Sequence, residues 1–429
     1  MTGTAREELL MGQHSEHSGT SETPMPSRRS FLRYAAIAAA TPVLTEAYFA
    51  RAAQTGVKPA AANGRHDYYL SPPADAVLIN ANENPLGPCQ AARDAIARLT
   101  PAGGRYDLYG ETDQLIKTFA TQHHLGEDHI AVYAGSSEPL HYTVLALTSP
   151  TRSLVIADPS YEAPMRAAAF AGAKIHRVPL TSDHAHPVKA MVAADPNAGV
   201  LYICNPNNPT GTLTSRQDIV WALENKPKGS VLLVDEAYIH FSDAPDVLDL
   251  VAADKDVIVL RTFSKIYGLA GLRCGFALAR PDLLAKLSPY GQNPLPVTGS
   301  GAANASMLDA DLVPTRKKAM TELRNENITW LKQNGYKVVG EPQSNCFMID
   351  TGRSGEAVMA AMQQKKVYIG RTWPIWPNAV RITVGTPEEM AKFRIAFKQV
   401  MDAPPGAETT THPQSAMADG VRPPRFTGA

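Results

Sequence analysis

The sequence predicts an α/β protein with a large domain on a mostly parallel sheet, helices on both sheet faces, and a smaller α+β domain. Three observations support this prediction. Short apolar runs alternate with segments of helical spacing, the runs end in polar residues, and the order of elements changes near Asp311. With 429 residues, of which 44% are hydrophobic and 19% charged, the chain is long enough to bury a sizeable core.

The large domain is expected over residues 104–310. Its strand-like runs, rich in Val, Ile and Leu, are His129–Gly135, Ser153–Tyr161, Lys174–Leu180, Gly199–Gly211, Ser230–Tyr238 and Asp256–Lys265. Segments with helical spacing lie between them at Ser137–Thr148, Ala163–Gly172 and Ser215–Lys226. Strands that alternate with helices favour a parallel sheet that is covered on both faces. In such folds ligands bind at the carboxyl ends of the strands.

The smaller domain is expected over residues 311–401. It begins with a helix at Val313–Asn334 and continues with strands at 336–340, 346–350, 367–371 and 380–385 and helices at Gly355–Lys366 and Pro387–Met401. We expect residues 53–103 to form an N-terminal arm and part of this domain, with Ile79–Leu99 packed against it. The Pro-, Thr- and Ala-rich tail, 402–429, lacks an apolar period and is expected to be disordered.

Residues 1–52 have the features of an export signal. The stretch "SRRSFLRY" (27–34) resembles the twin-arginine signals of bacteria, and a short apolar segment and "ARA" (50–52) follow it. A membrane anchor or an amphipathic helix is the alternative, but the apolar segment is shorter than the ~20 residues that span a bilayer. We therefore predict a periplasmic protein without a stable membrane span, exported by the twin-arginine machinery and cleaved near Ala52.

The composition argues against nucleic-acid and metal partners. Lys+Arg and Asp+Glu both number 41, and no long basic run is present. None of the four cysteines stands in a C-x-x-C pair, and no His/Cys spacing is typical of a metal site. Cys204 and Cys274 lie in apolar runs, where free buried thiols are expected.

Unusual polar residues stand at the ends of the predicted strands. Ser136 and Ser137 follow Gly135 at the start of a helix, where free N–H groups, hydroxyls and the helix dipole favour phosphate. An ordinary helix cap is the alternative. Tyr161 ends the next run, where its ring could either stack on a planar ligand or pack in the core.

Two further strand ends carry an amide and a carboxylate. Prolines and a glycine make "CNPNNPTG" (204–211) a stiff loop that presents the side chain of Asn208. Asp235 ends the apolar run "LLVD", so its carboxylate would be desolvated and would need a cationic group beside it. Tyr238 adds a hydroxyl three residues later.

The stretch "RTFSKIYGLAGLRCGF" (261–276) follows the last predicted strand of this series. It supplies the hydroxyls of Thr262 and Ser264, the amine of Lys265 and the guanidinium of Arg273, which suits an oxyanion. Its glycines allow the backbone to approach a ligand closely. Taken alone, Lys265 is most simply explained as a solvated charge.

Together the strand-end groups describe one ligand, pyridoxal phosphate, because its phosphate, ring, ring nitrogen, phenolic oxygen and aldehyde each meet a group of fitting chemistry. Ser136, Ser137, Ser264 and Arg273 would bind the phosphate, with Gly135 and Thr262 beside them. Tyr161 would face the ring, Asp235 the ring nitrogen, Asn208 and Tyr238 the phenolic oxygen, and Lys265 the aldehyde.

With these motifs the chain resembles the aminotransferase class I and II family, which has the fold-type-I pyridoxal-phosphate architecture, and within it the histidinol-phosphate aminotransferase branch. The matching stretches run from about Val77 to Ala396: "LINANENPLGP", "AGSSE", "CNPNNPTG", "VDEAY", "TFSKIYGLAGLRCGF" and "VRITVGTPEE". The resemblance implies a homodimer with shared active sites, in which Tyr109 reaches the cofactor phosphate of the other subunit. It also implies that Arg381 binds the substrate's α-carboxylate, with Arg371 as a second anion-binding arginine and Asn84 as a further substrate contact.

The activity that the resemblance implies is ping-pong transamination between an amino acid or related amine and a 2-oxo acid. Lys265 would form a Schiff base and move protons, supported by Asp235 and Tyr238. Decarboxylation or elimination with the same cofactor, and tailoring of a secreted metabolite by a periplasmic transaminase, are the alternatives. The stretch "YDLYGET" departs from the branch, and "TWPIWPNAV" (372–380) forms either an aromatic wall for a larger side chain or a rigid surface loop.

Overall fold

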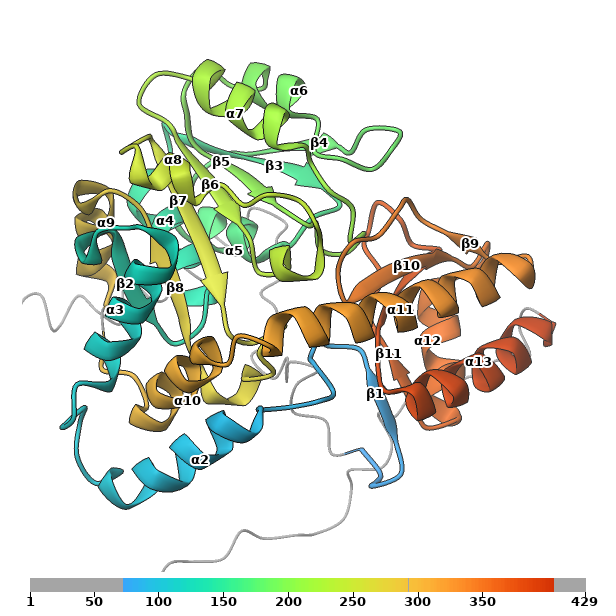
Figure 1. The fold of residues 1–429 in the computed structure, drawn as a ribbon. Coiled ribbons are helices and arrows are strands. Elements are labelled where there is room, and N and C mark those ends of the chain that lie inside the picture. Colours follow the sequence, from blue (N-terminus) through green and yellow to red (C-terminus); the bar gives the residue numbers. More distant parts are fainter. Residues whose placement is uncertain (1–71, 292, 405–429) are drawn as a thin grey trace, which may run out of the picture. The chain divides into compact units, whose positions relative to one another are not determined.

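The computed structural model of the protein describes residues 72–291 and 293–404. The predicted export signal, its cleavage site and nearly all of the predicted tail lie outside these residues. The described residues form a large sheet domain and a smaller α+β domain (Figure 1). This is the fold class that the sequence predicts.

The large sheet contains seven strands in the order β2-β8-β7-β6-β5-β3-β4. They are β2 (Ile130–Tyr133), β3 (Ser153–Asp158), β4 (Ile175–Pro179), β5 (Ala198–Cys204), β6 (Val231–Asp235), β7 (Val257–Thr262) and β8 (Gly275–Leu278). Strand β8 runs antiparallel to both β2 and β7, and the other neighbours are parallel. The six predicted strands are present. The sequence does not reveal β8, because four residues within a glycine-rich motif carry too little alternation.

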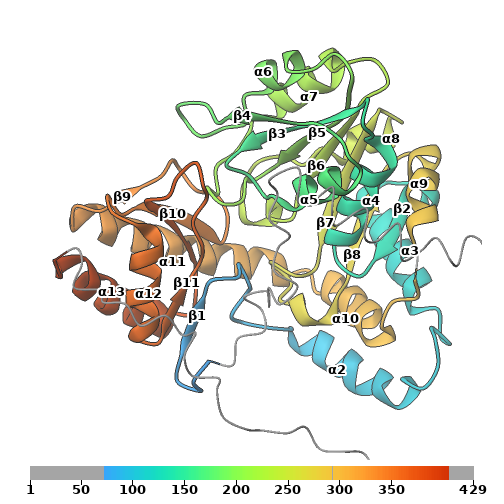
Figure 2. The same ribbon diagram turned by 180° about the vertical axis from the view of Figure 1, so that it is seen from behind.

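Two apolar cores lie on the two faces of this sheet. In β3, Leu154 and Ile156 belong to one core, whereas Val155 and Ala157 belong to the other. The first core includes residues of α4 (Ser137–Leu147), α5 (Ala163–Phe170) and α9 (Pro281–Leu287), and the second includes residues of α6 (Val188–Ala193), α7 (Arg216–Asn225) and α8 (Leu248–Ala252). Figures 1 and 2 show the sheet and its helices from opposite sides. Burial on both faces explains why the central strands are apolar throughout.

The smaller domain combines two short sheets with three helices. Strands β12 (Ala379–Thr383), β10 (Cys346–Asp350) and β9 (Lys337–Val338) are antiparallel, and β1 (Val77–Ile79) pairs in parallel with β11 (Val367–Ile369). The helices are α11 (Leu312–Gln333), α12 (Gly355–Gln364) and α13 (Pro387–Asp402). A capping box between Thr386 and Glu389 satisfies backbone N–H groups at the start of α13.

Residues 79–99 divide between the two domains. Strand β1 joins the smaller domain, as expected, but α2 (Gln90–Leu99) packs against α10 (Val297–Leu308), which also contacts α3 (Glu111–His123), so the expectation is wrong for α2. A Cβ on Gly301 would lie 2.2 Å from Leu99 Cδ1, so the small residues of α10 admit the apolar face of α2. The pattern of α2 shows which face is apolar but not which helix covers it.

All four cysteines are buried free thiols, which confirms the expectation for Cys204 and Cys274. Within residues 72–291 and 293–404, no helix is long and apolar enough to cross a bilayer. In the same part of the chain, no three His, Cys, Asp or Glu side chains gather where a metal ion could be held.

Candidate active site

Lys265 lies three residues beyond β7, at the carboxyl edge of the large sheet. Its side chain is half-buried, with Nζ 3.4 Å from the carbonyl oxygen of Ala81 and 5.6 Å from the ring centre of Tyr238. Burial, and after it the charge of Arg381, lowers the pKa of Lys265 to about 8. The amine therefore loses its proton in a pH range where an ordinary lysine stays charged.

Asp235 ends β6, the strand next to β7. Its carboxylate is buried, and it accepts hydrogen bonds from the Tyr202 hydroxyl at 3.0 Å and from the backbone N–H of Ala237 at 3.1 Å. Burial raises the pKa of Asp235 to about 6, although both hydrogen bonds and the charge of Lys265 act in the opposite direction. Among the described residues Asp235 has no ion-pair partner, so a buried carboxylate is left to meet a cationic group.

Tyr238 and Asn208 are buried near this lysine and Arg381. The Tyr238 hydroxyl oxygen accepts from Asn82 Nδ2 at 3.0 Å, and burial raises the pKa of Tyr238 well above its ordinary value. Asn208 Oδ1 accepts from Arg381 Nη1 at 2.9 Å. Within the described chain, the Tyr238 hydroxyl hydrogen and the Asn208 amide N–H groups have no acceptor, so both can donate to a ligand.

A cradle forms where Gly135 precedes α4 and the Arg273 side chain crosses it. Gly135 has a φ of +86°, and a Cβ there would lie 2.4 Å from Arg273 Nη2. The guanidinium of Arg273 donates to the carbonyl oxygens of Ala134 and Ala270, at 2.9 Å each. Ser136 is the N-cap residue of α4, yet its hydroxyl makes no cap hydrogen bond. Free N–H groups, hydroxyls and a cation thus converge on a site suited to an anion.

Thr262 and Ser264 reach the same neighbourhood through the sheet. Thr262 pairs with Gly275 of β8, and a Cβ on Gly275 would lie 2.8 Å from the backbone nitrogen of Ser136. Thr262 Oγ1 donates to Ser264 Oγ at 2.9 Å, and Ser137 is the first residue of α4. Strand pairing therefore gathers the predicted phosphate residues, which stand far apart in the sequence.

These features fit pyridoxal phosphate. The space beside Gly135, which a Cβ would fill, suits its phosphate. The buried carboxylate of Asp235, which has no cation beside it among the described residues, suits its protonated ring nitrogen, and the amine of Lys265, with its lowered pKa, suits its aldehyde. Tyr161 lies half-buried three residues beyond β3, packed against the first apolar core. That position supports the packing interpretation of Tyr161 directly, and its predicted stacking on the cofactor ring stays a prediction.

Trp373 lies between the two predicted anion-binding arginines. The indole is 4% exposed and donates from Nε1 to the carbonyl oxygen of Ser160 at 3.1 Å. The guanidinium carbons of Arg371 and Arg381 lie 4.8 and 5.7 Å from its ring centre. Trp373 is therefore packed inside the chain against both guanidiniums, and its predicted part in an aromatic wall stays a prediction. Trp376 packs edge-on against a histidine ring 5.6 Å away.

The two arginines differ in how they are occupied. Arg381 donates to Asn208 and, at 2.5 Å, to the carbonyl oxygen of Asn80, while its buried Nε has no hydrogen-bond partner among the described residues. Both Nη atoms of Arg371 donate to the carboxylate of Glu162, with Nη2 2.7 Å from Oε2. The Nε of Arg371 is likewise buried and without a partner among the described residues. The difference lies in the Nη atoms, because those of Arg371 meet a carboxylate, whereas those of Arg381 meet only uncharged oxygens.

In the described part of the chain, Asn84 and Tyr109 form no hydrogen bond with the other predicted site residues. Asn84 Nδ2 donates to the carbonyl oxygen of Ile266, and Oδ1 accepts from the backbone N–H of Leu86, both at 3.0 Å. This bonding ties the N-terminal segment to the loop that carries Lys265, and the predicted substrate contact of Asn84 stays a prediction. Tyr109 is 58% exposed, and its predicted reach into a second subunit stays a prediction.

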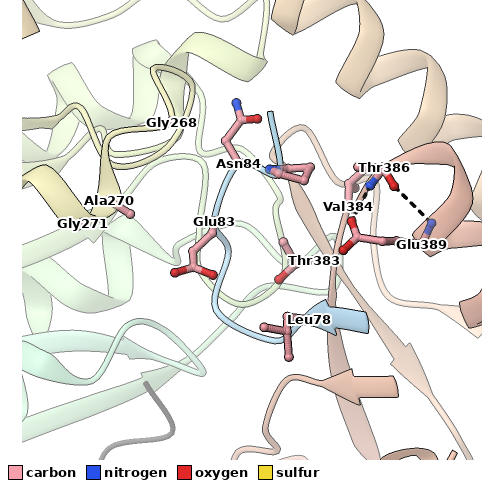
Figure 3. A pocket seen from close by; sticks show the side chains of 12 residues that line it. Leu78, Glu83, Asn84, Gly268, Ala270, Gly271, Thr383, Val384, Thr386 and Glu389 are labelled. Carbon is pink, nitrogen blue, oxygen red and sulfur yellow. Dashed lines mark hydrogen bonds between the residues drawn. The ribbon is translucent and has the colours of Figure 1, made fainter. Parts of the chain in front are cut away.

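A hollow of about 360 Å³ adjoins this loop. Figure 3 shows it bounded by Leu78 in the middle of β1, by the turn at Gly268 and by Glu389 near the start of α13. Glu83, another lining residue, favours the charged form of Lys265 and so raises its pKa. The hollow therefore lies close to the lysine.

The sequence interpretation missed three residues of the site: Asn82, Glu162 and Tyr202. Tyr202 carried a usable signal, because a tyrosine within a fully buried strand needs a partner for its hydroxyl. Asn82 stands in the same motif as Asn84, and nothing in the sequence distinguishes the two. Glu162 had no signal, since a carboxylate after a strand is most often solvated.

The fold and the residues at the strand ends define a pyridoxal-phosphate-dependent enzyme of fold type I. The sequence profile of the family "Aminotransferase class I and II" matches residues 74–397, and the chain belongs to this family. It is 33% identical over 333 residues to an aromatic amino acid aminotransferase of Cutibacterium acnes, covering 76% of this chain and 93% of that protein. It is 32% identical over 333 residues to a histidinol-phosphate aminotransferase of Symbiobacterium thermophilum, covering 76% and 91%.

A solved structure agrees with the fold. The histidinol-phosphate aminotransferase of Sinorhizobium meliloti, in complex with pyridoxal 5'-phosphate, superposes with a TM-score of 0.69 at 24% identity, covering 76% of this chain and 90% of that one. The chain is thus a pyridoxal-phosphate-dependent aminotransferase, similar to the histidinol-phosphate enzymes.

Proposed function

We propose that this aminotransferase acts in the periplasm as a homodimer, moving an amino group between an amino acid or related amine and a 2-oxo acid. One observation carries the catalytic part. A half-buried lysine with a pKa of about 8 and a buried carboxylate without an ion pair in the described chain lie at the ends of adjacent parallel strands.

The large domain would hold the cofactor. When bound, pyridoxal phosphate supplies an aldehyde that condenses with amines and a ring that draws electron density from the substrate's α-carbon. The residues that would bind its phosphate are Ser136, Ser137, Ser264 and Arg273. Asp235 would face the ring nitrogen, and Asn208 and Tyr238 would face the phenolic oxygen. Asp235, Asn208 and Tyr238 are buried, whereas Arg273 is exposed and Ser136 and Ser137 are partly buried, so the ring end of the site is the more enclosed one.

Lys265 moves the proton in this proposal. Its Nζ takes the proton from the α-carbon of the amino substrate and returns a proton later in the same half-reaction. A pKa near the working pH lets one amine serve first as base and then as acid, and the lowered pKa of Lys265 meets that requirement. Asp235 keeps a proton at the ring nitrogen, because its buried charge is stabilised by the positive group opposite it.

Arg381 binds the α-carboxylate of the substrate. The oxygens that its Nη atoms meet are uncharged, so its charge is open to an anion, and a carboxylate is the anion of an amino acid that suits a guanidinium. Trp373 covers the same guanidinium and keeps water from it.

The export part of the proposal rests on "SRRSFLRY" and the short apolar segment after it. A route that carries folded proteins suits an enzyme that must bind its cofactor before it crosses the membrane. Such a location would suit tailoring of a secreted metabolite.

A screen of amino donors tests the activity. Holoenzyme is mixed with single amino acids, and the visible absorbance of the cofactor and the 2-oxo product are followed together. We expect an absorbance shift and one equivalent of 2-oxo acid with at least one donor. Release of carbon dioxide in place of a 2-oxo acid would identify a decarboxylase, and cofactor that responds to no donor would overturn the proposal.

One variant tests the export, and a pair of variants tests the shared site. Replacing Arg28 and Arg29 by lysine should retain the protein in the cytoplasmic fraction; unchanged export would exclude the twin-arginine route. Chains carrying Lys265→Ala are then mixed and refolded with chains carrying Tyr109→Ala. If Tyr109 serves the other subunit, mixed dimers regain one intact site and part of the activity, whereas independent sites regain none.

A further inference from the structure

Glu162 occupies the position in which Arg371 would otherwise meet an anion from solution. Both Nη atoms of Arg371 donate to the two carboxylate oxygens of Glu162. Arg166, one helical turn further on, lies 3.5 Å from the same carboxylate. The side chains of Glu162 and Arg371 are 20% and 36% exposed, so the pair is partly buried and less screened than a fully exposed ion pair.

The pair changes the charge that the site presents. Arg371 and Arg381 both lie against the indole of Trp373, so the two guanidiniums flank one aromatic surface. With Glu162 in place, the charge of Arg371 is balanced and its two-pronged donor set is filled. The charge of Arg381 has no such partner, because the oxygens that it meets are those of an amide and a peptide group.

We propose that Glu162 is a specificity-determining residue that excludes substrates with an anionic side chain. The inference rests on the proposed function, since it concerns what the same site accepts. An amino acid with a single carboxylate meets Arg381, and its uncharged side chain leaves the Arg371–Glu162 pair undisturbed. A distal phosphate or carboxylate meets the Arg371–Glu162 pair and must displace a carboxylate that holds both donors.

The bonding of Glu162 favours this role over one in folding. Glu162 precedes α5 as its N-cap residue, but its side chain makes no cap hydrogen bond. Removing the carboxylate therefore leaves the helix start unchanged and frees Arg371. A like-charged substrate group is repelled by Glu162 and denied its natural cation, and both effects act against the same substrates.

The test compares three amino donors in the half-reaction of the holoenzyme: L-phenylalanine, L-glutamate and L-aspartate, of which the last two carry a second carboxylate on the side chain. We expect the wild type to prefer phenylalanine. Glu162→Ala should raise kcat/KM for the two donors with a distal anion by about tenfold or more, and change phenylalanine by less than about threefold. For Glu162→Gln, which keeps the shape of the side chain and loses its charge, kcat/KM for these two donors should lie between the values of the wild type and of Glu162→Ala.

Two further variants make the outcome decisive. In the double variant Glu162→Ala/Arg371→Met most of the gain should be lost, because the freed guanidinium binds the anion and only the relief of repulsion remains; a gain as large as in the single variant would overturn the proposal. Asp158→Asn is the matched control, a carboxylate on β3 that pairs with Arg177 at 3.9 Å, and should leave the ratio of donors unchanged.

The two proposals fail in different ways. If the wild type responds to no donor, the proposed function is wrong. If it transaminates phenylalanine, but Glu162→Ala alters all three donors alike or none of them, the function stands and the role of Glu162 is overturned.

Discussion

The cofactor side and the substrate side of the site are built on different principles. On the cofactor side, Lys265, Asp235 and the Gly135 turn stand at or just beyond strand ends of one large sheet, and each has a bonding capacity that the described chain leaves open. On the substrate side, Arg371 and Trp373 come from a loop of the smaller domain, and they bond to other side chains or backbone groups. The cofactor side therefore offers free bonding groups to one fixed ligand, whereas on the substrate side contacts within the protein determine which groups remain free to bind a substrate.

This contrast predicts two kinds of variant. Changes on the cofactor side should lower turnover of every substrate by the same factor. Changes on the substrate side should alter the ratio between substrates and leave turnover at saturation nearly intact.

The largest effect is expected for Lys265→Ala. Removing the amine removes both the covalent attachment and the proton carrier, so kcat should fall by at least about 10³-fold for every donor. Steady-state assays with two unlike donors check this, with thermal melting as the control for folding. An alanine variant that keeps a tenth of the activity with either donor would contradict the assignment.

Asp235→Asn should lower kcat by about 10²-fold, equally for all donors, because a neutral amide no longer holds a proton at the ring nitrogen. The amide retains the shape of the carboxylate and can still bond to the Tyr202 hydroxyl. Cofactor content, measured from absorbance after gel filtration, separates lost chemistry from lost binding. A loss of activity with only one donor would indicate that Asp235 contacts the substrate and not the cofactor.

The same substitution should act on the stability of the cofactor-free protein in a pH-dependent way. The pKa of Asp235 is raised from 3.8 to about 6, so the folded state holds this proton more tightly than the unfolded state. Below pH 4 the group is protonated in both states, and the stability that it contributes is complete. That contribution is lost as the pH rises through about 6, and the loss approaches about 3 kcal/mol.

Asp235→Asn removes this dependence. Cofactor-free variant and wild type should therefore unfold at similar denaturant concentrations at pH 4, while at pH 7.5 the variant should be the more stable. If the unfolding midpoints of variant and wild type differed by the same amount at both pH values, the carboxylate of Asp235 would not be desolvated. Added cofactor should reduce the advantage of the variant, because the ring supplies the missing cation.

Gly135→Ala should weaken cofactor binding by roughly tenfold, since the new Cβ collides with Arg273 and the backbone is held at positive φ. Gly335→Ala is the matched control. Gly335 has a φ of +79° with nothing within 4 Å of a Cβ, so it isolates the backbone strain from the collision. Titration of both cofactor-free variants with pyridoxal phosphate measures the difference in their affinities for the cofactor. Equal affinities would show that the contact between Gly135 and Arg273 does not contribute to phosphate binding.

The two sides also differ in how far the sequence predicts them. Lys265, Asp235 and Asn208 were predictable because each follows a run of apolar residues, and parallel strands bring such ends to one edge. The pairing of Arg371 with Glu162 was not, because it joins residues 209 positions apart, and no local pattern specifies which carboxylate a surface arginine meets.

The fold shows the same division. The sheet and its two helical layers follow from local periodicity, whereas the packing of α2 against α10 depends on Gly301, whose role appears only when the two helices are placed together. Strand β8 was hidden for a related reason, since its antiparallel direction is set by the chain that returns to pair with β7.

The smallest effect is expected for Trp373→Phe, and it bears most directly on the contrast between the two sides. Phenylalanine keeps an aromatic face for the two guanidiniums but loses ring area and the hydrogen bond to Ser160. A loss of about 0.5–1 kcal/mol of substrate binding corresponds to a rise of KM by roughly two- to fivefold. Because no proton carrier is touched, kcat should stay within about twofold.

Trp376→Phe is the control for that measurement, since Trp376 packs against His184 and contacts neither arginine. It should leave KM unchanged for every donor. The sharper comparison is between donors. Because the indole is 4% exposed and packs against both guanidiniums, Trp373→Phe should raise KM by the same factor for phenylalanine and for alanine; a larger rise for phenylalanine would show that its side chain reaches the indole. If both donors lose equally, Trp373 acts through Arg381 alone, and the side-chain preference must then arise entirely from the pair between Arg371 and Glu162.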